Sequence, residues 1–105
     1  MTRSLVALIT WGKLRPGAWG EFERTYRENV LTKGTNLRGL RGRWLAQDAA
    51  DKDTGFAPSL WDNLADMQAY EQSELYREIM APLQPYFLGE YKTYRCDVKY
   101  TDVGA

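Results

Sequence analysis

The aromatic residues of this sequence offer the clearest candidate chemistry, which is the binding of a flat ligand. Tryptophan, tyrosine and phenylalanine make up 13% of the 105 residues, and their flat faces stack on flat aromatic ligands. A cavity for a planar phenol or quinol is one interpretation. Packing in the core or at a dimer interface is the other, and it is the more common role of any one such side chain. The aromatic residues that could line such a cavity are Trp11, Trp19, Trp44, Trp61, Phe22, Tyr26 and Tyr70. The candidate ligand-binding residues are Trp61, Tyr70, Tyr26, Phe22, Tyr76 and Arg43.

Two arginines offer a site for an anionic group beside these aromatic rings. Arg41 and Arg43 are separated by one residue, so both lie on one face if the segment is a regular strand. A guanidinium stays charged and donates hydrogen bonds through a planar fork, which suits a phenolate or a carboxylate. The alternative is that both side chains lie on a solvated strand edge, which is the more frequent outcome for such a pair.

The absence of histidine excludes several classes of enzyme. Histidine is the usual base near neutral pH, the commonest metal ligand and the usual haem ligand, and this sequence has none and a single cysteine. Ser-His-Asp and Cys-His catalysis and a zinc cluster are therefore excluded, and we expect no metal and no cofactor. Cys96 is a reactive thiol only if its surroundings lower its pKa; otherwise it is an inert core side chain on an apolar strand face.

The charge balance argues against nucleic-acid and membrane partners. The chain has 14 basic and 14 acidic residues, so no net charge attracts a phosphate backbone or an anionic lipid surface. No apolar run reaches the roughly 20 residues that span a bilayer, and the N-terminus lacks a signal-peptide pattern. One cysteine agrees with a reducing compartment. We therefore expect a single domain over residues 1–105, located in the cytoplasm.

Trp61 ends a predicted strand that runs directly into a helix. Residues 56–61 are apolar or aromatic apart from Ser59, and Asp62 and Asn63 then offer side-chain oxygens that cap a helix N-terminus. The helix is therefore expected to begin after Asp62. Its apolar residues recur at helical spacing and include Tyr70, which places that ring on the face turned toward the sheet.

The rest of the chain divides into alternating strands and helices. The other predicted elements are a strand at Ser4–Trp11, a helix from Pro16 to Gly34, a strand at Leu37–Gln47, a polar loop at Asp48–Gly55 and a strand at Gly89–Tyr100. The helix after Asp62 is expected to break at Ser73-Glu74 and to end at Pro82 and Pro85. Gly34 is expected to form a left-handed helix C-cap. Gly39 and Gly42 indicate a bulge or a close backbone approach, so their strand is expected to bend.

The order of these elements predicts the fold class. A β-α-β-β-α-β order with right-handed crossovers gives an α+β, ferredoxin-like fold, with a four-stranded antiparallel sheet backed by helices. The strand at Ser4–Trp11 is apolar on both faces, and the helices of one domain cover only one face of a sheet. We therefore expect a partner chain, most simply a second copy, against the other face.

Several short motifs resemble the antibiotic biosynthesis monooxygenase family, over about residues 4–100. The motifs are Leu60-Trp61-Asp62, Met67, Ala69-Tyr70, Tyr76 and Gly89-Glu90-Tyr91. The segments Gly39-Leu40-Arg41-Gly42-Arg43-Trp44-Leu45 and Asp53-Thr54-Gly55-Phe56 resemble a bacterial and cyanobacterial branch of that family whose reaction is mostly unassigned. The resemblance implies a homodimer in which two sheets form one dimeric α+β barrel.

The chemistry that the resemblance implies depends on which branch of the superfamily is compared. Haem-degrading members use an Asn, a Trp and a His, and the matching positions here are Thr10, Tyr70 and Met80, so that triad is absent. Cofactor-free oxygenases use Asn, Trp, Tyr and Arg around an apolar pocket, which makes Trp61, Tyr70 and Asn63 the catalytic candidates. The resemblance thus implies a cofactor-independent monooxygenase or oxidase for a small phenol or quinol. The alternative is a dimeric small-molecule-binding protein without catalysis.

Overall fold

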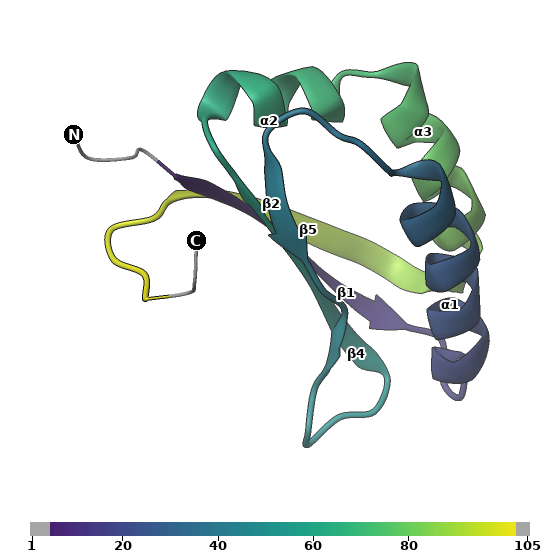
Figure 1. Cartoon of the computed structure of the whole chain (residues 1–105). Helices are drawn as coiled ribbons and strands as arrows, with labels where there is room; N and C mark the ends of the chain where they lie inside the picture. The colour runs from purple at the N-terminus through teal and green to yellow at the C-terminus, as the bar shows by residue number, and fades with distance from the viewer. Residues whose placement is uncertain (1–4, 103–105) are drawn as a thin grey trace.

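The computed structural model describes residues 5–102 and shows one antiparallel sheet with helices packed against one of its faces (Figure 1). The elements are β1 (Val6–Leu14), α1 (Trp19–Tyr26), the π-helical turn η1 (Arg27–Leu31), β2 (Leu40–Arg43), β3 (Ala46–Gln47), β4 (Thr54–Trp61), α2 (Leu64–Glu71), α3 (Glu74–Met80), the 3-10 helix η2 (Ala81–Tyr86) and β5 (Phe87–Asp97). Neighbouring strands follow the order β2-β4-β1-β5, and β3 also pairs with β4. The predicted α+β class and ferredoxin-like order are therefore confirmed.

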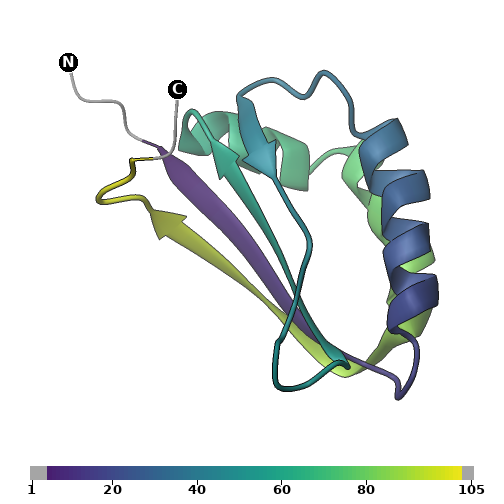
Figure 2. The ribbon, with the colours of Figure 1, turned by 60° about the horizontal axis from the view of Figure 1, so that its bottom comes forward.

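The helices cover one face of the sheet and leave the other face open (Figures 1 and 2). On the covered face, β1 contributes Val6, Leu8 and Leu14, each at most 5% exposed. On the opposite face, which we call the outer face, Trp11 pairs with Phe56 and Ile9 pairs with Tyr94. A hollow on the outer face is lined by Ile9, Trp11, Phe56, Lys92 and Tyr94. Both faces of β1 are thus apolar, and only one is covered within this chain.

The first helix differs from its prediction at both ends. Pro16 precedes the helix rather than starting it, because Gly17 adopts a φ of 77° and α1 begins at Trp19. The helix then changes to the π-helical turn η1, where the side-chain Nδ2 of Asn29 donates to the Thr25 backbone carbonyl oxygen at 3.0 Å. The predicted left-handed C-cap at Gly34 is wrong.

A left-handed residue does follow the first helix, but at Asn36, which has a φ of 56°. Asparagine adopts this conformation more readily than most other residues, because its short polar side chain can hydrogen-bond locally. Gly34 does not have a positive φ, so its backbone conformation does not require glycine.

The second half of the chain follows the predicted capping residues closely. Asn63 caps α2 by accepting a hydrogen bond from the Asp66 backbone N–H at 2.8 Å, and Ser73 caps α3 by accepting from Tyr76 at 3.1 Å. The predicted end at Pro82 and Pro85 is wrong in detail, since both prolines lie inside η2. The described helices include none that is long and apolar enough to cross a membrane.

The predicted bounds of the outer strands need correction. β1 continues to Leu14 instead of ending at Trp11, and its predicted first residue, Ser4, lies outside the described residues, as do tail residues 103–105. The last strand runs from Phe87 to Asp97 rather than from Gly89 to Tyr100. Cys96 is exposed in the single chain, because it lies on the outer face opposite Ala7 and not in the core.

Candidate functional site

A cavity of ≈ 70 Å³ lies between the covered face of the sheet and the helices. A buried water needs about 10–15 Å³ by the same measure, and an apolar cavity that binds benzene has about 150 Å³, so this cavity has room for several waters and is smaller than a closed site for one benzene ring. All six predicted ligand-binding residues line it: Trp61, Tyr70, Tyr26, Phe22, Tyr76 and Arg43. They come from β2, β4, α1, α2 and α3, so the fold assembles this wall from segments far apart in the sequence.

Stacked and edge-on rings form one side of the cavity. The Trp61 and Tyr70 rings stack with their centroids 5.2 Å apart, and Tyr76 meets Tyr70 edge-on at 5.0 Å. Trp61 is 1% exposed, and its Nε1 donates to the Ser59 hydroxyl at 2.8 Å. That hydroxyl in turn donates to the Leu8 carbonyl oxygen at 3.3 Å. The Trp61 ring is therefore held in one orientation, with one face stacked on Tyr70 and its N–H bonded within the chain.

The role of Ser59 was not predicted, although a signal for it exists in the sequence. Ser59 is the one polar residue in an otherwise apolar run from 56 to 61. A single hydroxyl in such a run needs a partner, and a tryptophan two residues later on the same strand face is within reach.

Burial makes the cavity tyrosines poor bases. Burial raises the pKa of Tyr70 to about 12, against a smaller lowering by Arg43. The pKa of Tyr76 also rises to about 12, first through burial and then through the nearby carboxylate of Glu71. Burial raises the pKa of Tyr26 as well. All three phenols therefore stay protonated near neutral pH and serve as hydrogen-bond partners.

Arg43 reaches the cavity because of a bulge in β2. Against β4, Leu40 pairs with Trp61, Gly42 with Leu60 and Arg43 with Ser59, so Arg41 is the extra residue. The predicted bulge is confirmed, and the prediction that Arg41 and Arg43 share one face is wrong. A bulge shifts the alternation of side chains by one residue, so Leu40 and Arg43 both line the cavity.

The two arginines consequently have different surroundings. Arg41 pairs with Asp62 at the surface, with 3.4 Å between its Nη1 and Oδ1 of Asp62. Arg43 is half-buried, and the described residues include no ion-pair partner for it.

Gly34 leaves the space that the Arg43 guanidinium occupies. A Cβ at Gly34 would lie 2.6 Å from Nη1 of Arg43 and 2.7 Å from the carbonyl oxygen of Val30. Because the backbone of Gly34 does not have a positive φ, the glycine is needed here for close approach and not for conformation. The segment that follows the first helix therefore contacts the edge strand β2 through Gly34 and the Arg43 side chain.

Comparison with solved structures places this architecture among known proteins. A protein from Nitrosomonas europaea provisionally named an antibiotic biosynthesis monooxygenase is 13% identical, with 95% of each chain covered and a TM-score of 0.80. A variant of SnoaB, a cofactor-independent oxygenase from Streptomyces nogalater, is 12% identical, covers 93% of this chain and 96% of that chain, and has a TM-score of 0.79. The fold is that of the antibiotic biosynthesis monooxygenases. No family model and no curated protein matches the sequence.

The solved structures confirm the ferredoxin-like fold of the single chain that the sequence motifs implied. Because identities of 12–13% indicate a shared fold alone, the reaction has to be argued from the residues of the cavity.

One catalytic candidate lies away from the cavity of this monooxygenase fold. Asn63 is exposed, and its side chain is used in the helix cap, with Oδ1 bound to the Asp66 N–H and Nδ2 donating to Oδ2 of Asp66 at 3.1 Å. Its prediction as a catalytic residue is therefore replaced by a capping role. Thr10 and Met80, the positions matched to the haem-degrading members, both line the cavity.

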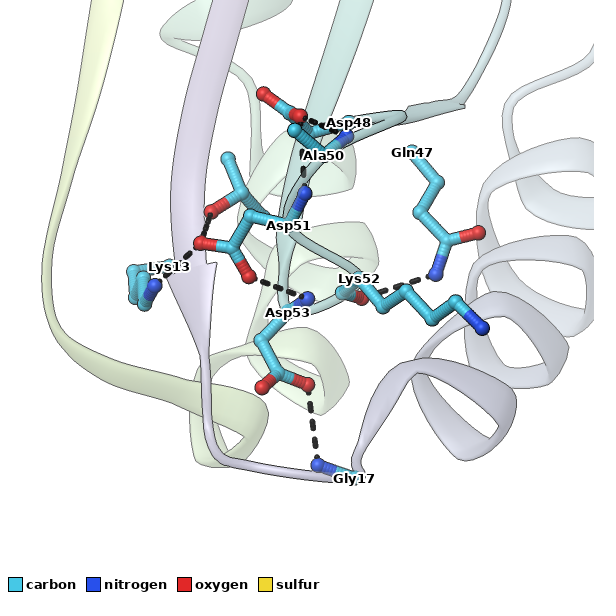
Figure 3. Close-up of polar contacts among 9 residues, drawn as sticks. Lys13, Gly17, Gln47, Asp48, Ala50, Asp51, Lys52 and Asp53 are labelled. Carbon is cyan, nitrogen blue, oxygen red and sulfur yellow. Dashed lines mark hydrogen bonds and ion pairs between the residues drawn. The ribbon is translucent and has the colours of Figure 1, made fainter.

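The polar loop between β3 and β4 uses its carboxylates to hold its own backbone (Figure 3). Asp48 accepts hydrogen bonds from the N–H groups of Ala50 and Asp51 at 2.7 and 3.1 Å. Asp51 accepts from the Asp53 N–H at 3.0 Å and the Thr54 hydroxyl at 2.8 Å, and it also pairs with Lys13. Within residues 5–102, no group of three His, Cys, Asp or Glu side chains is arranged to hold a metal ion.

Proposed function

We propose that this protein is a cofactor-independent monooxygenase or oxidase that acts on a small phenol or quinol bound in the cavity. The observation that carries the proposal is the aromatic wall that Trp61, Tyr70 and Tyr76 form in a largely apolar cavity. A flat electron-rich ring stacks on such a wall, and an apolar enclosure excludes water from reactive oxygen intermediates. The similarity in fold to SnoaB, named a cofactor-independent oxygenase, supports the same chemistry.

The electrons in this reaction come from the substrate. A phenol and O2 give a quinone and water, whereas a quinol and O2 give a quinone and hydrogen peroxide. In either case the ionised substrate first passes one electron to O2. The protein then has to stabilise the anion and orient the ring, which are tasks for fixed charges and packed side chains. A volume of ≈ 70 Å³ is too small for fused rings, and a single ring has to extend through the open side of the cavity or displace side chains that line it.

The proposed active form is a cytoplasmic homodimer of one-domain chains joined through the outer face. That face carries the apolar pairs Trp11 with Phe56 and Ile9 with Tyr94, and Tyr94 is 50% exposed in the single chain. Contiguous apolar surface of this kind commonly marks a protein interface. A second copy packed there supports the barrel that the sequence resemblance implies.

A non-catalytic small-molecule-binding protein is the second candidate. It is favoured by the absence of any carboxylate among the described lining residues, since a general base for the substrate hydroxyl would have to be sought elsewhere. This candidate shares the cavity and the ligand class with the first and differs only in the fate of O2.

Oxygen consumption separates these two candidates. The purified protein is incubated with hydroquinone, catechol and 4-aminophenol in an oxygen electrode, with peroxide assayed afterwards. Tyr70→Phe tests the cavity, and Tyr86→Phe is its control because the Tyr86 hydroxyl contacts Thr25 at 3.2 Å and does not line the cavity. We expect protein-dependent uptake that changes only in Tyr70→Phe. Ligand binding without any uptake would select the binding protein.

A further inference from the structure

Arg43 is the one formally charged side chain among the described residues that line the cavity. Four arginines within residues 5–102 form ion pairs with carboxylates: Arg38 with Asp66, Arg41 with Asp62, Arg77 with Glu74 and Arg95 with Glu71. Arg43 is half-buried beside apolar rings, and the described chain supplies no carboxylate to it. A partly desolvated charge without a counter-ion is unfavourable, and a bound anion would offset that cost.

Two local features hold the guanidinium at this place. The bulge at Arg41 turns Arg43 toward the covered face of the sheet, and the missing side chain of Gly34 leaves the space for Nη1. A side chain at position 34 would require Nη1 of Arg43 to shift from its present position. A solvated edge arginine requires neither feature, so the arrangement is better explained by a role for the charge inside the cavity.

Arg43 also lies close enough to the cavity hydroxyls to affect them. Its charge lowers the pKa of both Tyr26 and Tyr70, against the larger effect of burial. The titratable groups that face the cavity are Tyr26 from α1, Tyr70 from α2 and Tyr76 from α3. All three stay neutral, so they do not compete with a ligand anion for the guanidinium.

We infer that Arg43 binds the ionised oxygen of the ligand, so that this cavity selects a single-ring phenol in its phenolate form. The proton leaves to solvent water as the phenol binds, and no base in the cavity has to accept it. This inference rests on the proposed function, since it concerns the ligand of the same cavity. In many enzymes a general base removes the proton of the substrate hydroxyl. Here the fixed positive charge of Arg43 lowers the pKa of the bound phenol, so the phenolate forms without a base.

The test follows the ionisation of a bound phenol directly by its absorbance. 4-Nitrophenol is the probe, since it is a single ring, ionises near neutral pH and absorbs visibly only as the phenolate. 4-Nitroanisole, in which a methyl group replaces the proton, is the neutral probe. We expect bound 4-nitrophenol to ionise at least one pH unit below free 4-nitrophenol, which corresponds to about a tenfold preference for the anion. We expect 4-nitroanisole to bind more weakly.

Variants at two neighbouring arginines assign the effect to one side chain. Arg43→Gln is expected to abolish the preference for the phenolate while leaving the binding of 4-nitroanisole within about twofold, which also reports an intact cavity. Arg43→Lys is expected to keep part of the preference and serves if Arg43→Gln does not fold. Arg41→Gln is the matched control, because Arg41 pairs with Asp62 outside the cavity, and it is expected to behave as the unaltered protein.

The outcomes separate this inference from the proposed reaction. Ionisation of bound 4-nitrophenol at the same pH as the free phenol, or an equal loss in Arg41→Gln and Arg43→Gln, would overturn the inference even if the protein consumes O2. If the protein prefers the phenolate through Arg43 but consumes no O2, the inference is supported and the proposed oxidation is contradicted. Failure of both probes to bind would overturn the inference, and the O2 assay would still decide on the reaction.

Discussion

Truncation of Trp61 tests whether the wall of the cavity is also part of the core. The side chain is 1% exposed and packs in a cluster with Val6, Leu8 and Met67. Replacing a buried aromatic side chain by alanine costs about 3–5 kcal/mol, and a domain has only about 5–15 kcal/mol of stability in total. We therefore expect Trp61→Ala to lose a large part of the free energy of unfolding.

The loss is measured by urea unfolding followed by circular dichroism at a fixed protein concentration. With an m-value of about 2 kcal/mol/M in urea, a loss of about 4 kcal/mol lowers the midpoint by about 2 M. Trp44→Ala is the control, because Trp44 lies between β2 and β3 and is 52% exposed, and its loss should be about half that of Trp61→Ala or less. Equal midpoints for the two variants would refute the argument that Trp61 belongs to the core.

This magnitude decides which variant is suitable for ligand studies. A protein that has lost about 4 kcal/mol can lose ligand affinity simply because part of it is unfolded. Trp61→Phe keeps a ring to stack on Tyr70 and gives up mainly the hydrogen bond to Ser59, which is worth about 1 kcal/mol. The phenylalanine variant therefore separates the contribution of the indole to binding from its contribution to folding.

The remaining predictions concern association, haem and acid stability. Light scattering at micromolar concentration should give the mass of a dimer, and Trp11→Glu on the outer face should give a monomer; a folded wild-type monomer would remove the barrel. Haem titration should give no stoichiometric complex that degrades haem with a reductant, since Met80 stands where the resemblance places histidine. Lys13 and the Asp53 N–H hold the pKa of Asp51 at about 2, below its unfolded value of about 3.9. The stabilisation is thus present above about pH 4 and lost as the pH falls toward 2; a plot of Tm against pH that is equally steep in Asp51→Asn would contradict this.

Helix capping was predictable because it depends on residues that are neighbours in the sequence. Asn63 and Ser73 each accept a hydrogen bond from an N–H three residues later, and such short-range patterns are visible in any window of a few residues. The same locality explains the error at Asn63. The Asn63 side chain forms hydrogen bonds to both the backbone and the side chain of Asp66, so this asparagine is explained by its helix cap.

The position of Arg43 was not predictable in the same way, because it depends on pairing with a distant strand. Gly39 and Gly42 indicated a bulge, but which residue is the extra one follows only from the pairing of β2 with β4. A shift of one residue exchanges the two faces of a strand. Likewise, Gly34 was interpreted from its place at a helix end, whereas its role comes from Arg43, which contacts it across the fold.

The titration behaviour of the cavity predicts how the reaction should depend on pH. Tyr70 and Tyr76 have pKa values near 12, so the described lining offers no protein group that changes charge between pH 6 and pH 9. The rate of O2 consumption should then rise with pH as the bound phenol ionises and should level off without a falling limb in this range. Phenols of different acidity should move the rising limb in parallel with their own ionisation. A rising limb at one fixed pH for all phenols would instead identify a titrating protein group as the base, and would contradict the assignment of this task to a fixed charge.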